Sequence, residues 1–380
     1  MSQKGGELIG MGSFGCVFNP SLKCPGDKVN QDDVVSKVFF NKDGRKELNQ
    51  EYKLTTLIRN IPGSENWSEV WYKKCKPDNY DKLYNQDSEI EDCLEENNID
   101  PYEFNKIRMM LQGRYGGETF TDYCRKKFTK KVFSSKKDFT KQFLDIVKKM
   151  KPLFIGLQAM YKKGIGHNDI KNDNIVIDER GCRYIDFGFS SKYTDKKFYK
   201  KRGSLEFLTD RIYPPYPYEF IFLYATPEIL EENDKYDLQY GLHRSLHDRY
   251  LLVHEDFFNR KVKYYLPSLV DKFIKEGSAI QKGVKGNRIL SLLDTYSLGM
   301  LLPFTLSSLA KNYGKIKAFK RYISSNPIHL IKDLFYHMTE PDAEERMNPN
   351  DVYDKYLEIE KLYLTKQKTK KRTNRRTRRA

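Results

Sequence analysis

The sequence predicts an α+β fold of two lobes, with a β-rich first third and a mainly helical remainder. Two observations carry this prediction. Runs of β-branched and aromatic residues, separated by glycine and proline, fill the first forty residues and are typical of hairpins. Beyond Gly117, apolar residues recur at helical spacing over longer stretches. The chain has 380 residues, of which 39% are hydrophobic, so it is long enough for both lobes.

Strands and one helix are expected in the first sixty residues. Apolar and β-branched runs predict strands at 7–10, 16–18 and 34–40, with a glycine-rich turn between the first two. Residues 46–58 then change to helical spacing, with apolar side chains near one face. The first part of the chain is therefore expected to be a sheet with a helix packed on it.

A short buried strand at 107–111 is expected to end the first lobe, before a turn at 112–117. Apolar side chains then follow helical spacing from 139 to 163, which predicts a long helix that Pro152 kinks. Further strands and helices are predicted at 175–177, 183–185, 294–309 and 350–364. The second lobe is therefore mainly helical.

These patterns divide the chain into a first lobe at 5–112, a second lobe at 113–362 with an insertion at about 237–288, and a tail at 363–380. Residues 366–380 hold nine Lys or Arg and no acid, out of a formal net charge of +16. Because the tail has no apolar residue except its terminal alanine, we expect it to be disordered. It is expected to contact a polyanion, an acidic partner or a nuclear import receptor, with a solubilising extension as the alternative.

The acidic stretch and the cysteines are each expected to have a structural rather than a functional role. Residues 87–100 hold seven acids and no base, which favours a solvated loop over a docking site for a basic segment. The six cysteines are scattered, without a CxxC pair or a Cys/His cluster at zinc spacing. We therefore expect reduced thiols, as in a cytosol-like compartment.

Membrane and secretory segments are not expected. The longest apolar stretch, 297–310, is too short to span a bilayer and predicts a buried helix. Residues 1–10 lack the apolar stretch of a signal peptide. We expect no membrane association and a cytoplasmic location, with nuclear import through the tail as the alternative.

A glycine-rich motif lies between the first two predicted strands. Residues 10–17 read G-x-G-x-x-G-x-V, and glycine lets a backbone approach phosphate oxygens with no β-carbon in the way. Alone the pattern has little specificity. A dinucleotide-binding fold would need these glycines to open a helix, but Cys-Val-Phe and a proline follow, which favours strand–turn–strand.

Lys37 lies inside the apolar strand at 34–40. A lysine there is commonly surface-facing, but it gains meaning if a carboxylate on the next helix pairs with it. Glu47 and Glu51 both qualify by position, and Glu51 is preferred because the apolar residues after it would hold its helix on the sheet. The pair would fix the ammonium group where it can bind two phosphates of a nucleotide.

The most specific pattern is H-N-D-I-K-N-D-N at 167–174, followed by an apolar strand and D-F-G at 186–188. Phosphoryl transfer to a hydroxyl needs a carboxylate that orients the hydroxyl and accepts its proton, and it needs oxygen ligands for Mg²⁺. Asp169 suits the first task, and Asn174 and Asp186 suit the second. The order and spacing together favour this chemistry over two unrelated polar turns.

In these motifs the chain resembles a eukaryotic-type protein kinase, over roughly residues 5–360. Further on, Y-A-T-P-E at 224–228 is similar to the A-P-E segment of that family, and D-T-Y-S-L-G at 294–299 is similar to its D-x-W-S-x-G helix. Arg346 resembles the late arginine that pairs with the A-P-E glutamate. The resemblance implies a two-lobed protein-kinase-like fold.

The same resemblance implies ATP and Mg²⁺ as cofactors and serine or threonine hydroxyls of proteins as substrates. Asp169 would be the catalytic base and Lys171 would steady the transferred phosphoryl group, while Asn174 and Asp186 would bind the metal. Leu111 would guard the adenine pocket. The other residues implied at the nucleotide are Ile9, Gly10, Met11, Gly12, Ser13, Phe14, Gly15, Val17, Lys37 and Glu51, with Gln112 and Arg114 offering backbone groups to adenine and Glu118 reaching the ribose. A plain interlobe turn is the alternative for these last three.

The chain departs from the family pattern at positions that bear on its regulation and on where its activation segment ends. Asn168 stands where many members have an arginine that grips a phosphorylated loop, so activation by loop phosphorylation is not expected. Either Glu219 or Glu228 can close the activation segment. Small size, loop insertions and a Lys/Asn/Tyr/Phe-rich composition resemble kinases of large cytoplasmic DNA viruses, for which the location would be the host cytoplasm or the virion.

Three other functions are alternatives to a protein kinase. A kinase-fold scaffold without activity would be expected to lack the lysine, the base or the metal aspartate, and all three are present. A small-molecule phosphotransferase shares the base and the metal ligands, but the glycine motif and the A-P-E-like segment favour protein substrates. A nucleic-acid-binding protein would rest on the tail alone. We expect a monomer.

Overall fold

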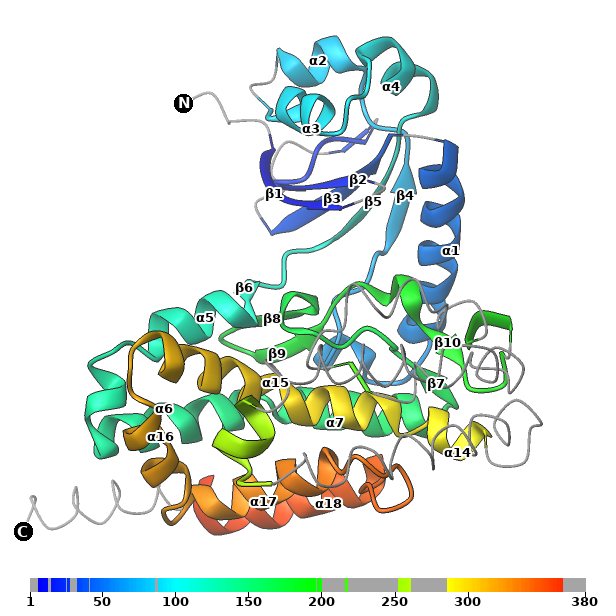
Figure 1. The fold of residues 1–380 in the computed structure, drawn as a ribbon. Helices are drawn as coiled ribbons and strands as arrows, with labels where there is room; N and C mark the ends of the chain where they lie inside the picture. Colours follow the sequence, from blue (N-terminus) through cyan, green and yellow to red (C-terminus); the bar gives the residue numbers. More distant parts are fainter. Residues whose placement is uncertain are drawn as a thin grey trace, which may run out of the picture. The chain divides into compact units, whose positions relative to one another are not determined.

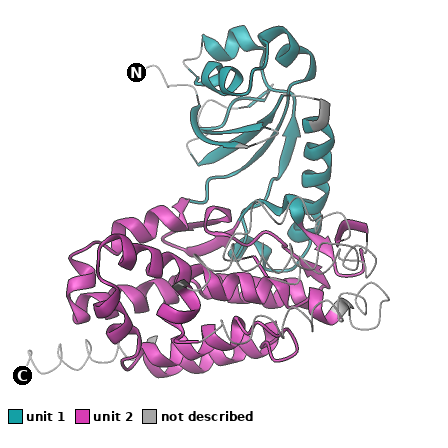
Figure 2. Ribbon diagram, in the orientation of Figure 1, with its two compact units in different colours: residues 1–117, 185–189 teal, residues 118–184, 190–380 magenta. Residues whose placement is uncertain are grey.

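The computed structural model of the protein describes residues 6–12, 15–24, 26–27, 33–40, 42–85, 88–195, 197–199, 216–217, 252–260 and 286–364. The chain divides into two compact units (Figure 2), one of residues 1–117 with 185–189 and the other of residues 118–184 with 190–380. The first unit thus ends at Gly117, in the segment where the join of the lobes is predicted. Residues 365–380 of the predicted tail and most of the insertion at 237–288 lie outside the described residues.

The first unit contains a five-stranded antiparallel sheet with strand order β1-β2-β3-β5-β4 (Figure 1). Its strands are β1 (Glu7–Gly12), β2 (Gly15–Asn19), β3 (Val34–Phe39), β4 (Lys73–Cys75) and β5 (Met109–Arg114). Gly12 pairs with Gly15 at the end of the β1–β2 ladder. The glycine-rich motif therefore forms strand–turn–strand, as predicted, and the three early strands are confirmed.

Helix α1 (Lys42–Arg59) runs alongside this sheet (Figure 1) and confirms the helix predicted at 46–58. Its Leu48 is buried in a cluster with Phe39 of β3 and Leu111 of β5, so two strands and the helix share one apolar layer. Burial of such side chains contributes about 1.5–3 kcal/mol each. This layer fixes α1 against the strand that carries Lys37.

The strand predicted at 107–111 is shifted in the structure. Ile107 ends the short helix α4 (Pro101–Ile107), and β5 continues to Arg114, so residues 112–114 are strand rather than turn. The strand is longer because its neighbour β3 offers backbone partners: Ser36 pairs with Gln112 and Val34 with Arg114. Pairing across the sheet overrides the weak strand tendency of Gln-Gly-Arg.

The prediction of a solvated loop at 87–100 is wrong. These residues contain helix α3 (Ile90–Glu96), which lies with α2 (Tyr80–Tyr84) and α4 at one end of the unit (Figure 1). Ile90, Cys93 and Leu94 are buried in the core of the unit, whereas the acids of α3 are exposed. The spacing i, i+3, i+4 of these three residues is a helical pattern that the acidic composition concealed.

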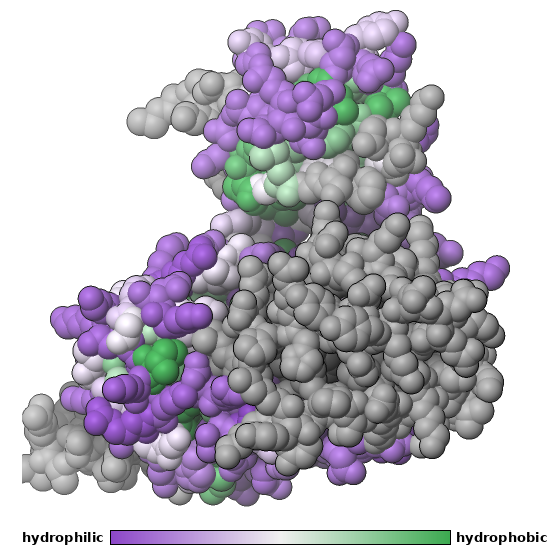
Figure 3. Space-filling view, in the orientation of Figure 1, coloured by the Kyte–Doolittle hydropathy of each residue, from purple (hydrophilic) through white to green (hydrophobic). Residues whose placement is uncertain are grey.

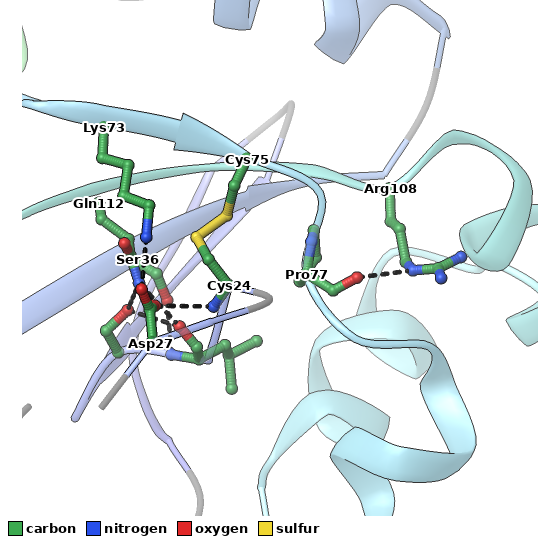
Figure 4. The surroundings of a disulfide bond; sticks show 10 residues. Cys24, Asp27, Ser36, Lys73, Cys75, Pro77, Arg108 and Gln112 are labelled. Atoms are coloured by element: carbon green, nitrogen blue, oxygen red, sulfur yellow. Dashed lines mark hydrogen bonds and ion pairs between the residues drawn. A yellow bond between two sulfur atoms is a disulfide. The ribbon is translucent and has the colours of Figure 1, made fainter. Parts of the chain in front are cut away.

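The expectation that the cysteines are reduced thiols is wrong for four of the six. Cys16 is bonded to Cys93 and Cys24 to Cys75, across 77 and 51 residues of sequence, and Figure 4 shows the second of these disulfides. The free thiols of Cys124 and Cys182 are buried. Sequence spacing does not reveal these pairs because packing of α3 and β4 on the sheet brings the partners together.

The second unit is mainly helical. The helix predicted at 139–163 is two helices, α6 (Lys136–Lys149) and α7 (Lys151–Lys162). They meet at Met150, and Pro152 lies in the first turn of α7, where its missing N–H costs no helical hydrogen bond. The second unit also contains the helices α5 (Phe120–Lys127), α14 (Gly286–Leu290), α15 (Leu293–Asn312), α16 (Ile316–Ile323), α17 (Ile328–Met338) and α18 (Pro349–Ile359).

The long apolar segment forms the central helix of the second unit. Residues 288–312 include one helix long and apolar enough to cross a membrane, but 94% of its apolar window is buried inside the protein. Sixteen of the twenty residues of α15 are buried. This helix therefore belongs to the core, as the sequence predicted. The helix predicted at 350–364 is α18, followed by a π-helical turn at Glu360–Leu364.

Short strands hold the segments around residue 170 in place. They are β6 (Glu118–Thr119), β7 (Ile165–Gly166), β8 (Ile175–Asp178), β9 (Gly181–Tyr184) and β10 (Ser191–Lys192). β6, β8 and β9 form one sheet, and β7 pairs with β10 in another. The strands predicted at 175–177 and 183–185 are therefore confirmed, with the second ending at Tyr184.

Candidate active site

Lys37 of β3 is paired with Glu51 of α1. The ammonium Nζ lies 2.8 Å from Glu51 Oε2, and Trp71 Nε1 donates to Glu51 Oε1 over 2.6 Å. Only 4% of Glu51 is exposed, so its carboxylate is held by these two donors rather than by water. The structure thus selects Glu51 over Glu47 as the direct partner.

Asp186 adds to the field at Lys37. It lies in the first unit, just before the 3-10 turn η4 (Phe187–Phe189), and α1 contacts this turn. Burial alone would lower the pKa of Lys37, but the carboxylates of Glu51 and Asp186 outweigh burial and raise it. Lys37 is therefore a fixed cation beside two carboxylates.

The backbone around Asp186 is unusual. Asp186 has φ 56°, a left-handed conformation that non-glycine residues seldom adopt, and its Oδ1 accepts from the backbone N–H of Gly188 over 3.3 Å. Phe187 is 1% exposed and anchors the turn. Such local strain clusters at functional sites, where the surrounding packing maintains it.

In the second unit, Asp294 of α15 holds the segment before Asp169. Its Oδ2 accepts from the backbone N–H of His167 over 2.6 Å and its Oδ1 from that of Asn168 over 2.9 Å. Asn168 has φ 62°, so the chain turns sharply at this point. Burial raises the pKa of Asp294, and the backbone donors offset part of this effect. A buried carboxyl group on the core helix thus sets the direction of the loop.

The side chains predicted around the catalytic base come together. Asn174, in the 3-10 turn η3 (Asn172–Asn174), donates from Nδ2 to Asp169 Oδ2 over 2.7 Å and to the Asp169 carbonyl over 2.9 Å. Lys171 Nζ lies 3.4 Å from the same Oδ2. Asp169 is 8% exposed and Asn174 is 5% exposed. The Asp169 carboxylate is therefore held in one orientation by an amide and an ammonium group.

Each unit by itself offers an oxygen atom of the kind that a hard divalent cation binds. Asn174 directs its amide nitrogen at Asp169, which leaves its carbonyl oxygen as the group that can bind a metal. The Asp186 carboxylate supplies the oxygen ligand that Mg²⁺ prefers, usually together with water and substrate phosphates. Among the described residues no group of three His, Cys, Asp or Glu is placed to hold a metal ion.

The glycine motif is placed on β1 and β2, and its tip, Ser13 and Phe14, lies outside the described residues. Ile9, predicted to contact the nucleotide, is 47% exposed, and its contact with a nucleotide stays a prediction. A β-carbon on Gly15 would collide with the carbonyl oxygen of Val38. Glycine is thus required at 15 by the neighbouring strand, whereas a β-carbon on Gly10 would meet nothing closer than 3.8 Å, at Val17.

The three hinge residues have separate surroundings. The backbone carbonyl of Gln112 accepts from the N–H of Tyr72 over 2.9 Å, and its side-chain amide donates to Asp27 over 2.8 Å (Figure 4). Arg114 is exposed at the end of β5, and Glu118 pairs with Lys126 over 2.6 Å. Gln112 is therefore occupied in the sheet, which counts against its carbonyl as an adenine contact.

One residue of the candidate site was not predicted. The hydroxyl of Tyr199 donates to Asn168 Oδ1 over 3.2 Å, next to the proposed base. Tyr199 is 2% exposed and is buried in a cluster with Tyr193, Leu290 and Leu293. No spacing in the sequence links residue 199 to residue 168, so only the folded chain reveals this contact.

Glu219 and Glu228, the two candidates for the expected partner of Arg346, both lie outside the described residues. Arg346 itself is 4% exposed, and its guanidinium group donates to the carbonyls of Leu292 over 3.2 Å and Glu340 over 3.0 Å. Arg346 is thus held at the start of α15, and the choice between the two glutamates stays a prediction.

The central segment of the chain is similar to known protein kinases. Residues 108–237 match the family profile described as Protein kinase domain. The chain is 43% identical over 51 residues to Mitogen-activated protein kinase kinase kinase 3 of Arabidopsis thaliana and 45% identical over 56 residues to Serine/threonine-protein kinase STE11 of Saccharomyces cerevisiae. It is 30% identical over 110 residues to Ribosomal protein S6 kinase alpha-1 of Homo sapiens.

These matches are partial. They cover 13%, 14% and 28% of this chain, and they span only 8%, 8% and 13% of the relatives' own lengths. A crystal structure of a kinase domain is similar at a TM-score of 0.44 and 14% identity, covering 91% of this chain and 92% of the other. The β-rich first unit, the mainly helical second unit and the profile match at 108–237 confirm the predicted α+β, two-lobed protein-kinase-like fold. The partial sequence matches are to serine/threonine kinases.

Proposed function

We propose that this chain is an active protein kinase that transfers the γ-phosphoryl group of ATP to serine or threonine hydroxyls, with Mg²⁺. The observation that carries the proposal is the buried Asp169 carboxylate, fixed by Asn174 over 2.7 Å and by Lys171 over 3.4 Å. A carboxylate in one orientation can align a hydroxyl and accept its proton as the new P–O bond forms.

Each charged residue has a distinct task in this mechanism. Asp169 accepts the proton of the attacking hydroxyl, and the Lys171 ammonium stabilises charge on the transferred phosphoryl group. Lys37, kept in place by Glu51, binds phosphate oxygens of the nucleotide. When bound, Mg²⁺ neutralises charge on the phosphates, and Asn174 and Asp186 supply oxygen atoms to hold it.

Serine/threonine specificity rests on Lys171, two residues after the base, and on the partial matches to serine/threonine kinases. An inactive scaffold is less favoured because Lys37, Asp169 and Asp186 are all retained. A small-molecule phosphotransferase is less favoured because the profile matched is that of a protein kinase domain.

The proposed function is accompanied by a proposed cellular location and oligomeric state. We propose a monomer in the cytoplasm, or in the host cytoplasm or virion if the resemblance to viral kinases holds, with the basic tail binding a polyanion or acidic partner. The two disulfides of the first unit are unusual for a cytoplasmic protein, so their state in the cell decides the proposed location. Reduced thiols would support the cytoplasm, and intact disulfides would contradict it. Thiol trapping of the native protein before lysis, followed by mass spectrometry of Cys16 and Cys24, tests this directly.

The function itself is tested with labelled ATP and Mg²⁺, offered with generic basic and acidic proteins, followed by phosphoamino-acid analysis. Label in phosphoserine or phosphothreonine that requires Mg²⁺ supports the proposal. Label in small molecules alone supports the phosphotransferase, and absence of transfer with every substrate class supports the scaffold.

A further inference from the structure

The positive charge of this protein is concentrated in two places. Of the net charge of +16, the tail at 366–380 supplies nine, and residues 125–151 supply another nine, from eleven Lys or Arg and two acids. The rest of the chain therefore carries a net charge of −2. Residues 125–151 belong to the folded second unit, where they run from α5 through α6 to the first residue of α7, so this charge has a fixed surface.

Most of the lysines in residues 125–151 are exposed to solvent. The opposite face of α6 is buried through Phe139, Phe143 and Val147, so the charged positions point outward. Hydrophilic side chains cover much of the surface over α5 and its neighbours (Figure 3). Among the described residues, the exposed lysines of this segment that form no ion pair are Lys127, Lys130, Lys131, Lys136, Lys137, Lys141 and Lys148.

Three of these lysines line a cavity of about 460 Å³. Lys127 comes from the last turn of α5, and Lys141 and Lys148 come from one face of α6, two turns apart. Tyr123 forms the apolar wall, with Lys127 Nζ 5.6 Å from the centre of its ring. Asp145 and Glu179 lie among the lysines. We name these lining residues the α5–α6 groove.

We infer that the α5–α6 groove is a docking surface for an acidic segment of a protein partner, rich in aspartate, glutamate or phosphorylated side chains. In this account, which rests on the proposed kinase function, the partner is a protein substrate. A concave surface lined by separated cations raises the local concentration of an anionic segment and speeds its association.

The composition of the groove favours a protein over a nucleic acid. Its cations are lysines, which act as point charges, whereas arginine is the residue suited to bidentate phosphate contacts. Asp145 and Glu179 would repel a continuous phosphate backbone, but they can accept hydrogen bonds from the backbone N–H groups of a peptide. The Tyr123 ring offers an apolar contact between charged positions.

The test uses the full chain and a charge-reversed variant, K127E/K141E/K148E. The matched control, K163E/K311E/K317E, changes three exposed lysines of the same unit outside the groove. A fluorescein-labelled peptide of about twelve residues, half of them glutamate, is titrated by anisotropy. Both variants are repeated with the nine tail cations replaced by glutamine, so that the tail does not mask the groove.

We expect the groove variant to bind the peptide at least about tenfold more weakly and the control to change by less than about threefold. K127Q/K141Q/K148Q should give an intermediate loss, which guards against misfolding of the reversed variant. Equal losses in the groove and control variants, or no loss in either, would overturn the inference. Single-stranded DNA of equal charge is titrated in the same way. If the DNA binds more tightly than the peptide and loses its affinity only in the groove variant, the groove is a nucleic-acid site instead.

A kinetic arm separates this inference from the proposed function. Two serine peptides, identical except for the acidic segment, are compared as substrates. The acidic segment should lower KM about tenfold with kcat unchanged, and the groove variant should abolish this difference while phosphorylating the plain peptide normally. Phosphorylation of both peptides with equal KM would overturn the docking inference alone, whereas absence of all phosphorylation with intact, groove-dependent binding would overturn the kinase function alone.

Discussion

Removing one hydroxyl group, in Tyr199→Phe, should slow catalysis without unfolding the protein. The Tyr199 hydroxyl donates to Asn168 Oδ1 over 3.2 Å, and both residues are 2% exposed. Asn168 directly precedes Asp169 and has a left-handed φ of 62°. Phenylalanine keeps the ring in its cluster with Tyr193, so only the hydrogen bond is lost.

The size of the effect follows from the burial of this bond. A buried hydrogen bond contributes about 1 kcal/mol net, and more where its loss leaves an acceptor less well satisfied. If this free energy holds the loop in its productive geometry, its loss corresponds to about a fivefold decrease in kcat, since 1.36 kcal/mol is tenfold in rate. KM for ATP should stay unchanged, because Lys37 and Glu51 belong to the other unit.

Tyr193→Phe is the matched control, because this ring lies in the same cluster and no described residue hydrogen-bonds to its hydroxyl. Steady-state kcat and KM are measured for both variants before and after phosphatase treatment. We expect phosphatase to leave wild-type activity unchanged, since Tyr199 anchors the segment where many kinases use a phosphate. A kcat for Tyr199→Phe within twofold of the control, or a large loss of wild-type activity with a phosphate mapped to 190–228, would refute the reasoning.

Three further predictions concern the charged groups. Lys37→Met should impair nucleotide use and destabilise the fold by about 3 kcal/mol at neutral pH, because the buried Glu51 carboxylate loses its cation. Burial favours a protonated Glu51, so the destabilisation measured in thermal melts should shrink at low pH. A destabilisation that grows at low pH would contradict this prediction. Asp186→Asn should abolish Mg²⁺-dependent transfer while binding of a fluorescent adenine nucleotide survives, and full activity across magnesium concentrations would count against the metal role. Burial would raise the pKa of Asp178, but hydrogen bonds from Arg183 and the neighbouring arginine lower it to about 2. The ionised Asp178 carboxylate stabilises the folded protein at pH values above its ordinary pKa of 3.8, and this stabilisation is lost as pH falls toward 2. In chemical denaturation, Asp178→Asn should therefore reduce the acid-dependent fall in the free energy of unfolding by about 1 kcal/mol, a figure discounted for partial exposure.

The charged motifs could be predicted from the sequence because the chemistry fixes their spacing. Asp169, Lys171 and Asn174 are separated by at most five residues, so one loop brings them together whatever the rest of the chain does. The pairing of Lys37 with Glu51 follows from a strand and the helix after it. The remaining features depend on packing between distant segments.

Three such features could not be predicted. The disulfide partners of Cys16 and Cys24 lie 77 and 51 residues away. Gln112 enters the sheet because β3 offers it a partner, although its local sequence indicates a turn. Tyr199 contacts Asn168 across 31 residues of sequence. In each case, the deciding contact is between residues that no short-range pattern connects.

The most direct test of the account is the activity of Asp169→Ala and Asp169→Asn with labelled ATP, Mg²⁺ and a protein substrate. Both variants lack the carboxylate that Asn174 and Lys171 hold, and Asp333→Asn, at an exposed position on α17, is the control. The account predicts that both Asp169 variants lose about 10²–10⁴ in kcat while the control keeps wild-type activity. Wild-type turnover in folded Asp169→Asn would contradict the assignment of Asp169 as the catalytic base and, with it, the proposed kinase mechanism.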